Sequence, residues 1–365
     1  MSRKHSQLSP LQHLEPPSAN DGSIYPVISS LKQLADITET DYVYLRQVVG
    51  RQQPEPYKTF RIRKKSGGFR VIAIPDDRLL GVQQWIHRHI LAFAQPSPVS
   101  YAFQRGKSIH DVARLHCGCR WLIKLDLYNF FGAISEIDVY RVFHRLGYQP
   151  LIAFELARLC TRLGSQTAFR RRRRWQIADH YGVIDQYQGQ RIGHLPQGAP
   201  TSPALSNLVM VEFDRKVLNL AAEQQLTYSR YADDLCFSTP QRDFSRDLAK
   251  AFIHQVYRLM RDYGQSPNMS KTAIIPPGAR KVVLGLLVDS EQPRLQKSLR
   301  NRLRQHIFYL NHPDIGPQEH AHRRGFDSTV GFKKHLDGLL SHVNDIDPGA
   351  LQRYRRQLAD VYWPN

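Results

Sequence analysis

Three aspartates stand where their carboxylates could act together. Asp126 closes the apolar run WLIKLD, while Asp233 and Asp234 are adjacent between the two apolar halves of LTYSRYADDLCFS. An isolated Asp-Asp pair is usually an ordinary polar turn, but neighbouring carboxylates repel each other and do not persist in a buried cleft without a cation. Carboxylate oxygens suit Mg²⁺. A pair of such ions can activate a hydroxyl and stabilise a departing pyrophosphate, so the pattern favours metal-dependent phosphoryl transfer.

These carboxylates need strands to bring them together. The apolar run that ends at Asp126 is expected to be a strand, and residues 227–239 a β-hairpin with Ala232-Asp233-Asp234 at its tip. Strands interleaved with helices predict an α+β domain whose sheet presents carboxylates at two places. Helices are expected at 77–94, from Ser108, from Ser135 to near Gly147, from Ser202 (as the cap), at 244–263 and from Gln296, with further strands at 57–75, 273–275 and 282–288.

A cluster of cations lies in the segment YKTFRIRKKSGGFRVIAIP, residues 57–75, which is expected to form two strands joined at Ser66-Gly67-Gly68. Such a cluster can be a solvated sheet edge that uses charge to block aggregation, or it can grip phosphates. The segment alone supports both interpretations. The cations are Arg61, Arg63, Lys64, Lys65 and Arg70.

The net charge of the chain points to a polyanionic partner. Lys and Arg number 51 against 32 Asp and Glu, which gives +19. Such an excess favours nucleic acid, because phosphate contacts release condensed counterions. A membrane surface would require a strongly basic amphipathic helix, and none stands out. The consecutive arginines can clamp an RNA backbone beside Trp175 or form a solvated charge block; they are Arg170, Arg171, Arg172, Arg173 and Arg174.

The cellular location is expected to be the cytoplasm. No stretch approaches the ~18 apolar residues of a membrane span, and the amino-terminal MSRKHSQLSP lacks the apolar core of a signal peptide. Cys117 and Cys119 form a C-x-C without a second Cys or His pair at zinc-finger spacing, so ordinary reduced thiols are expected.

Taken together, the motifs resemble those of reverse transcriptases. YADD at 231–234 resembles their catalytic motif, KLDLYNFF at 124–131 their first carboxylate motif, and LPQGAPTSP at 195–203 their nucleotide-side loop. The hairpin with Arg70 resembles their fingers strands, Asn268-x-x-Lys271 the motif after the second carboxylates, and VLGLLVD at 283–289 the primer-grip hairpin. The resemblance covers roughly residues 57–290. It implies a right-hand polymerase fold with an N-terminal extension at 1–40, fingers at 41–115, a palm at 116–290 with a basic insertion at 165–194, and a helical thumb at 291–365.

The resemblance also implies roles for single residues. Asp126 and Asp233 would bind two Mg²⁺ ions, with Mn²⁺ as the alternative, and Asp234 would complete the set. Lys271 would protonate or neutralise pyrophosphate. Phe131 occupies the position of an aromatic gate that blocks a ribose 2′-hydroxyl and so selects dNTPs, although Phe130 and Phe131 as a pair could instead be core aromatics. The triphosphate and the incoming nucleotide would contact Lys64, Lys65, Arg70, Gln197 and Gly198.

Among reverse transcriptases, YAFQRGKSI at 101–109 and the basic thumb resemble bacterial retron enzymes. Two sequence motifs typical of retron enzymes are matched only in part. In place of Asn-Ala-x-x-His this chain has Val112-Ala113-Arg114-Leu115-His116, and in place of Val-Thr-Gly it has Val283-Leu284-Gly285. A different defence-associated reverse transcriptase, or a polymerase-derived RNA-binding scaffold that holds an effector protein, therefore stays open. The expected partners are a structured non-coding RNA, its complementary DNA, dNTPs and an effector protein, with RNA contacts from Arg170–Arg174, Gly285, Lys297, Arg300 and Arg304.

Overall fold

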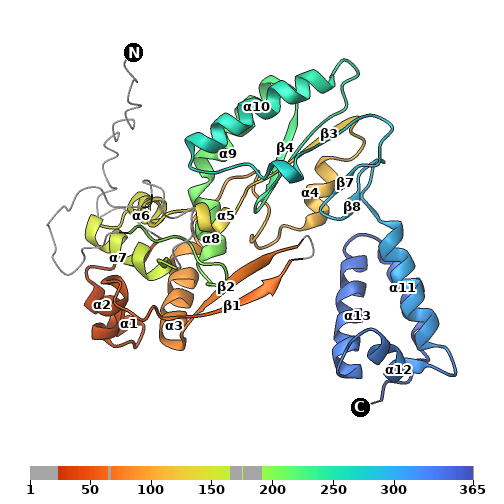
Figure 1. Ribbon diagram of the computed structural model, residues 1–365, viewed down its shortest axis with the longest axis horizontal. Coiled ribbons are helices and arrows are strands. Elements are labelled where there is room, and N and C mark those ends of the chain that lie inside the picture. Colours follow the sequence, from red (N-terminus) through yellow and green to blue (C-terminus); the bar gives the residue numbers. More distant parts are fainter. Residues whose placement is uncertain (1–23, 65–66, 165–174, 176–190, 365) are drawn as a thin grey trace. The chain divides into compact units, whose positions relative to one another are not determined.

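The computed structural model describes residues 24–64, 67–164, 175 and 191–364 (Figure 1). Lys65 and the run Arg170–Arg174 lie outside these residues, so the roles expected of them stay predictions. Over the described residues, no helix combines the length and the apolar character needed to cross a membrane.

The chain divides into two compact units. The first contains the described residues of Met1–Pro98, Leu127–Arg215 and Leu259–Ser266. The second contains those of Val99–Asp126, Lys216–Arg258 and Pro267–Asn365. All three aspartates of interest fall in the second unit.

The first unit combines short helices with a two-stranded hairpin. Strands β1 (Tyr57–Arg63) and β2 (Phe69–Pro75) pair antiparallel, with Tyr57 opposite Pro75 and Arg63 opposite Phe69, which confirms the predicted hairpin. From Lys58 onward, every residue of β1 is exposed. The helical elements are α1 (Leu31–Ile37), α2 (Tyr42–Val49), α3 (Asp77–Ile86), the π-helix η1 (His87–Leu91), α5 (Phe130–Ala133), α6 (Glu136–Arg145), α7 (Pro150–Cys160) and α8 (Ser202–Val209).

A buried ionic network ties these helices together. The Glu136 carboxylate accepts a hydrogen bond from Arg51 at 2.5 Å and one from the backbone N–H of Gly193 at 2.9 Å, and lies 3.6 Å from Arg158. Arg51 also donates to the backbone oxygen of Thr161, and Arg158 to that of Val49. All three charged side chains are less than a tenth exposed. The network therefore places two buried guanidinium groups around one buried carboxylate, which compensates part of their charge.

The second unit is built on a four-stranded antiparallel sheet of order β4-β5-β3-β6. Its strands are β3 (Trp121–Asp126), β4 (Thr227–Tyr231), β5 (Asp234–Thr239) and β6 (Ala273–Ile275), which confirms the predicted strand and hairpin. Helix α4 (Ile109–Leu115) lies beside this sheet, and α9 (Val211–Glu223) and α10 (Arg246–Asp262) contain residues of both units. Phe252 of α10 packs edge-on against Phe237 of β5.

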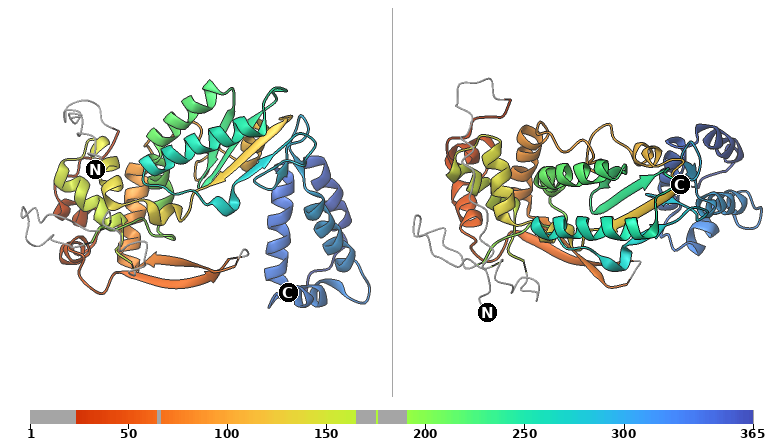
Figure 2. Two further views of the ribbon diagram at one scale, coloured as in Figure 1. Left: turned by 45° about the horizontal axis from the view of Figure 1, so that its top comes forward. Right: turned by 90° about the horizontal axis from the view of Figure 1, so that it is seen from above.

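The carboxy-terminal part of the second unit is helical, as the sequence predicted. A small sheet of β7 (Val282–Val283), β8 (Leu286–Leu287) and β9 (Arg294–Leu295) precedes four helices that pack consecutively (Figures 1 and 2). These helices are α11 (Lys297–Leu310), α12 (Gly316–Arg323), α13 (Thr329–Asn344) and α14 (Pro348–Gln357). One hydrophobic cluster includes Leu122 of β3, Leu286 of β8, Leu303 of α11 and Phe332 of α13, so sheet and helices share a core.

Side-chain caps set several helix starts. Ser108 and Ser135 each accept from the backbone N–H three residues later, and Asp111 and Asp138 return the bond, as expected from their spacing. The expectation of Ser202 as a cap was wrong by one residue. Thr201 is the N-cap of α8, and Ser202 is the first helical residue, followed by Pro203.

Candidate active site

The register of the main sheet brings the acidic motifs together. Asp126, the last residue of β3, lies directly opposite Asp234, the first residue of β5. Directly opposed residues of antiparallel strands share a face, so both carboxylates belong to one side of the sheet. Asp233 lies in the turn between β4 and β5, and Asp234 is paired within the strand rather than at the tip, where the sequence analysis had put it. Asp126 is 3% exposed.

The turn that carries Asp233 is held in an uncommon conformation. Ala232 has a φ of 55°, in the left-handed region that residues with a Cβ seldom adopt. Its carbonyl accepts a hydrogen bond of 3.1 Å from the guanidinium of Arg230, which is completely buried. The backbone N–H of Arg230 donates to the Val99 carbonyl, and the Arg230 carbonyl accepts from the N–H of Tyr101. Sequence reasoning missed Arg230, although an arginine within the apolar strand TYSRY was the available signal.

Two polar side chains donate hydrogen bonds to the carboxylate of Asp126. Asn268 donates to its Oδ1 at 2.8 Å, and Lys271 donates to its Oδ2 at 2.6 Å. The Asn268 backbone N–H also donates to the Asp126 carbonyl. The hydrogen bond to Asp126 raises the pKa of Lys271, so the ammonium form is favoured. Lys271, proposed from its motif, thus reaches the first carboxylate, whereas the contact of Asn268 was not foreseen.

Asp234 lies among other carboxylates. Burial, followed by repulsion from Asp233 and Asp126, raises the pKa of Asp234 to about 6. Across the residues that the structure describes, no three His, Cys, Asp or Glu side chains converge in a way that could hold a metal ion. Asp126 faces Lys271 instead. In donor chemistry the set nevertheless fits a hard divalent cation, because it consists of carboxylate oxygens whose mutual repulsion such an ion would relieve.

A buried histidine joins the two strands of the acidic hairpin. His116 follows α4, is fully buried, and has its Nδ1 2.7 Å from Ser238 Oγ of β5 and its Nε2 2.7 Å from Ser229 Oγ of β4. In the neutral ring one nitrogen donates and the other accepts. Burial lowers the pKa of His116 to about 4. The partly matched retron motif therefore contributes a buried structural residue that joins β4 and β5, the strands on either side of Asp233.

His116 gives the fold a pH dependence. Between its ordinary pKa of about 6.5 and its folded value of about 4, the unfolded chain binds a proton there that the folded chain does not. Stability is therefore complete above this window, and we expect the free energy of unfolding to fall by up to about 3 kcal/mol as pH drops through it. Urea titrations at several pH values should show a smaller fall for His116→Gln. His254→Gln, at an exposed histidine, should keep the wild-type fall.

The predicted nucleotide-side loop is fixed to the hairpin of the first unit. The Ala73 N–H of β2 donates to the Gln197 carbonyl at 2.8 Å. Gly198 has a φ of 123°, and a Cβ there would lie 2.9 Å from Ile72 Cγ2 and 3.0 Å from the Ala73 oxygen. Only glycine therefore fits against β2 at this position. Lys64 and Arg70, on the same hairpin, are exposed.

The two phenylalanines after Asp126 differ in their surroundings. Phe130 is 4% exposed and belongs to the core, whereas Phe131 is half-buried, with 5.4 Å between the ring centroids. Of this pair, Phe131 is therefore the one with surface left to contact a ligand.

The expected RNA-contacting residues that the structure describes lie at the surface or in a turn. Leu284 and Gly285 form the turn between β7 and β8, with φ angles of 46° for Leu284 and 86° for Gly285. The Gly285 carbonyl accepts a hydrogen bond from Gln296 Nε2 at 3.0 Å. Lys297, Arg300 and Arg304 are exposed on α11.

Comparison with known proteins identifies a family and several similar proteins. Residues 62–286 match the family described as "Reverse transcriptase (RNA-dependent DNA polymerase)". The retron Mx65 reverse transcriptase of Myxococcus xanthus is 32% identical over 84% of this chain, and the alignment covers 65% of that protein. The retron Ec86 reverse transcriptase of Escherichia coli is 28% identical over 88% of this chain and 91% of that protein. A solved telomerase from Candida albicans is similar at a TM-score of 0.45 and 12% identity, over 86% of this chain and 57% of that one.

Proposed function

The chain belongs to the reverse transcriptase (RNA-dependent DNA polymerase) family, and we propose that it is a retron-type enzyme that uses divalent metal ions to copy a dedicated structured non-coding RNA into DNA. The observation that carries the proposal is the opposition of Asp126 and Asp234 across β3 and β5, with Asp233 in the adjoining turn. An effector protein is proposed as a further partner, and the cytoplasm as the location.

In this proposal Asp126 and Asp233 hold two Mg²⁺ ions and Asp234 completes the ligand set. When bound, the ions supply charge that acidifies the primer 3′-hydroxyl and stabilises the pyrophosphate leaving group. Asn268 orients the Asp126 carboxylate through its Oδ1. Lys271, which now pairs with Oδ2 of Asp126, provides an ammonium group that neutralises or protonates pyrophosphate.

We assign nucleotide binding to residues of the first unit. Lys64 and Arg70 carry exposed cations for the triphosphate, and Lys65 is proposed beside them from its motif. Gln197 and Gly198 are proposed to lie along the incoming nucleotide, and the missing Cβ of Gly198 lets this loop pack closely against Ile72 and Ala73 of β2. Phe131 excludes the ribose 2′-hydroxyl.

The proposal is tested by nucleotide incorporation. Purified protein is given a primed RNA template, dNTPs and either Mg²⁺ or Mn²⁺. Primer extension that stops when the metal is chelated and resumes when it is restored supports a metal-dependent polymerase. RNA binding without extension under all metal conditions would instead favour a scaffold that holds RNA without copying it.

The gate gives a prediction of its own. We expect Phe131→Ala to raise the use of ribonucleotides relative to deoxyribonucleotides by about tenfold, since shape discrimination in a pocket has this magnitude. A competition assay with NTP and dNTP on one template measures the ratio. Phe93→Ala, at an exposed phenylalanine of the same unit, should leave the ratio unchanged. An unchanged ratio in Phe131→Ala would make Phe131 a packing residue.

A further inference from the structure

An exposed stripe runs along α11 and ends in an aromatic side chain. Lys297, Arg300, Arg304 and Phe308 are separated by three or four residues, so they lie along one face of the helix. All four are exposed, and Phe308 is 61% exposed. The opposite face buries Leu303 and Leu310, among others, in the core. In the described part of the chain, the three cations of the stripe form no salt bridge, so their charge is available to a partner.

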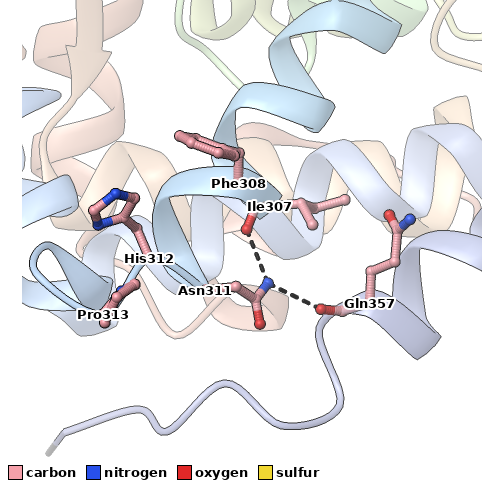
Figure 3. A pocket seen from close by; sticks show the side chains of 6 residues that line it. All are labelled: Ile307, Phe308, Asn311, His312, Pro313 and Gln357. Carbon is pink, nitrogen blue, oxygen red and sulfur yellow. Dashed lines mark hydrogen bonds between the residues drawn. The ribbon is translucent and has the colours of Figure 1, made fainter.

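The stripe leads to a hollow of about 440 Å³ at the end of α11 (Figure 3). This volume lies within the ~300–1,000 Å³ of small-molecule pockets. The side chain of Asn311 joins the two helices at this hollow, because its Nδ2 donates to the Ile307 carbonyl of α11 at 2.8 Å and to the Gln357 carbonyl of α14 at 3.0 Å (Figure 3). The residues that line the hollow are Ile307, Phe308, Asn311, His312, Pro313 and Gln357.

The hollow combines a π surface with oriented polar groups. The ring of His312 lies 5.7 Å from that of Phe308, centroid to centroid. Its Nδ1 accepts the backbone N–H of Asp314 at 3.2 Å, and the Asp314 carboxylate is 3.9 Å from the same nitrogen. The neutral ring therefore carries its proton on Nε2, which is a donor. Asn311 contributes the oxygen of its side-chain amide as an acceptor.

These features together fit one ligand chemistry. An exposed aromatic ring with donor and acceptor groups beside it suits a nucleobase, whose faces are apolar and whose edges carry hydrogen-bonding groups. The adjoining cations suit the phosphates of the same strand. Successive members of the stripe rise by about 4.5–6 Å along the helix, on the scale of one nucleotide step. An apolar peptide segment would leave Arg300 and Arg304 without counter-charges.

We infer that Phe308 is a stacking platform for an unpaired base of RNA, with Arg304 and Arg300 holding the phosphates of the adjoining nucleotides. This inference rests on the proposed function, since it specifies where the enzyme reads single-stranded parts of its RNA. The base edge meets Nε2 of His312 and the side-chain oxygen of Asn311. Binding at this site therefore requires an unstacked base and excludes a blunt duplex.

The test measures the affinity of the full chain for a fluorescein-labelled, unstructured 12-nucleotide RNA and for the same sequence as a blunt duplex. Phe308→Ala should weaken single-strand binding by about 5- to 150-fold, the range expected for one stacked base. Duplex binding should change less than twofold. Phe308→Trp should restore single-strand affinity. Tyr362→Ala, at an exposed aromatic of the same unit, should bind like the wild type.

Salt dependence separates stacking from charge. Arg304→Ala should lower the slope of log affinity against log salt by about 0.7, the value for one phosphate contact in a single strand. Phe308→Ala should weaken binding without changing that slope. Single-strand affinity within twofold of wild type in Phe308→Ala would overturn the inference and leave the hollow to a protein partner. Primer extension by the wild-type protein is measured in a separate assay. A lack of extension would contradict the polymerase proposal, whereas the binding measurements would still test the role of Phe308.

Discussion

Asp233→Asn is expected to lower DNA synthesis on a primed RNA template by about 10³-fold or more, while the chain stays folded. An amide is a poor ligand for a hard cation, and metal stabilisation of the transition state amounts to several kcal/mol, where each 1.36 kcal/mol corresponds to a factor of ten. Asp233 lies in the turn between β4 and β5, so its amide removes charge without disturbing strand pairing. The initial rate of dNTP incorporation in Mg²⁺ is the measurement.

The matched control for this variant is Asp243→Asn, which makes the same chemical change at an exposed position of the same unit. Its rate should equal that of the wild type. Thermal unfolding of both variants checks that the fold is retained. A well-folded Asp233→Asn protein with near-normal turnover would show that Asp233 is not a metal ligand.

Glu136→Gln is expected to lower the free energy of unfolding by about 3–5 kcal/mol, the loss typical of breaking a buried ion pair from one side. Arg51 and Arg158 would keep their buried guanidinium groups and lose the carboxylate that compensates them. Urea denaturation followed by linear extrapolation gives the value.

An exposed ion pair supplies the comparison for this stability prediction. Glu212 pairs with Arg215 at 2.8 Å on the surface of α9, and Glu212→Gln should change stability by less than about 1 kcal/mol. If Glu136→Gln also lowered the free energy of unfolding by less than about 1 kcal/mol, other groups would have to compensate the charges of the buried arginines. The network would then not be what ties α2, α6 and α7 together.

Local patterns were sufficient to predict most elements of the structure. The segment 57–75, with its turn residues Ser66-Gly67-Gly68, predicted β1 and β2, and the spacing of Ser108 to Asp111 predicted the start of α4. The α+β class and the right-hand polymerase fold implied by the resemblance are confirmed by the antiparallel sheets and the family match. These features depend on residues close in sequence, or on motifs in a known order.

Contacts between distant residues could not be predicted in the same way. His116 lies more than 100 residues from both serines that it joins, and nothing in its neighbourhood indicates such partners. The pairing of Asn268 with Asp126 likewise joins residues that are 142 positions apart, and it depends on how the segment before β6 returns to β3. Burial of Arg230 was missed because charge alone favours the surface, whereas the carbonyl of Ala232 provides an internal acceptor.

The hydrogen bond from Ala73 to Gln197 makes one backbone amide a reporter of loop docking. Ala73 directs its N–H away from β1, toward the loop, so the hairpin ladder does not shield that proton from solvent. Its exchange with deuterium is therefore governed by the opening of the loop from β2. If a nucleotide binds along Gln197 and Gly198, as proposed, we expect this exchange to slow, so the exchange rate of the Ala73 amide would report whether the loop is occupied.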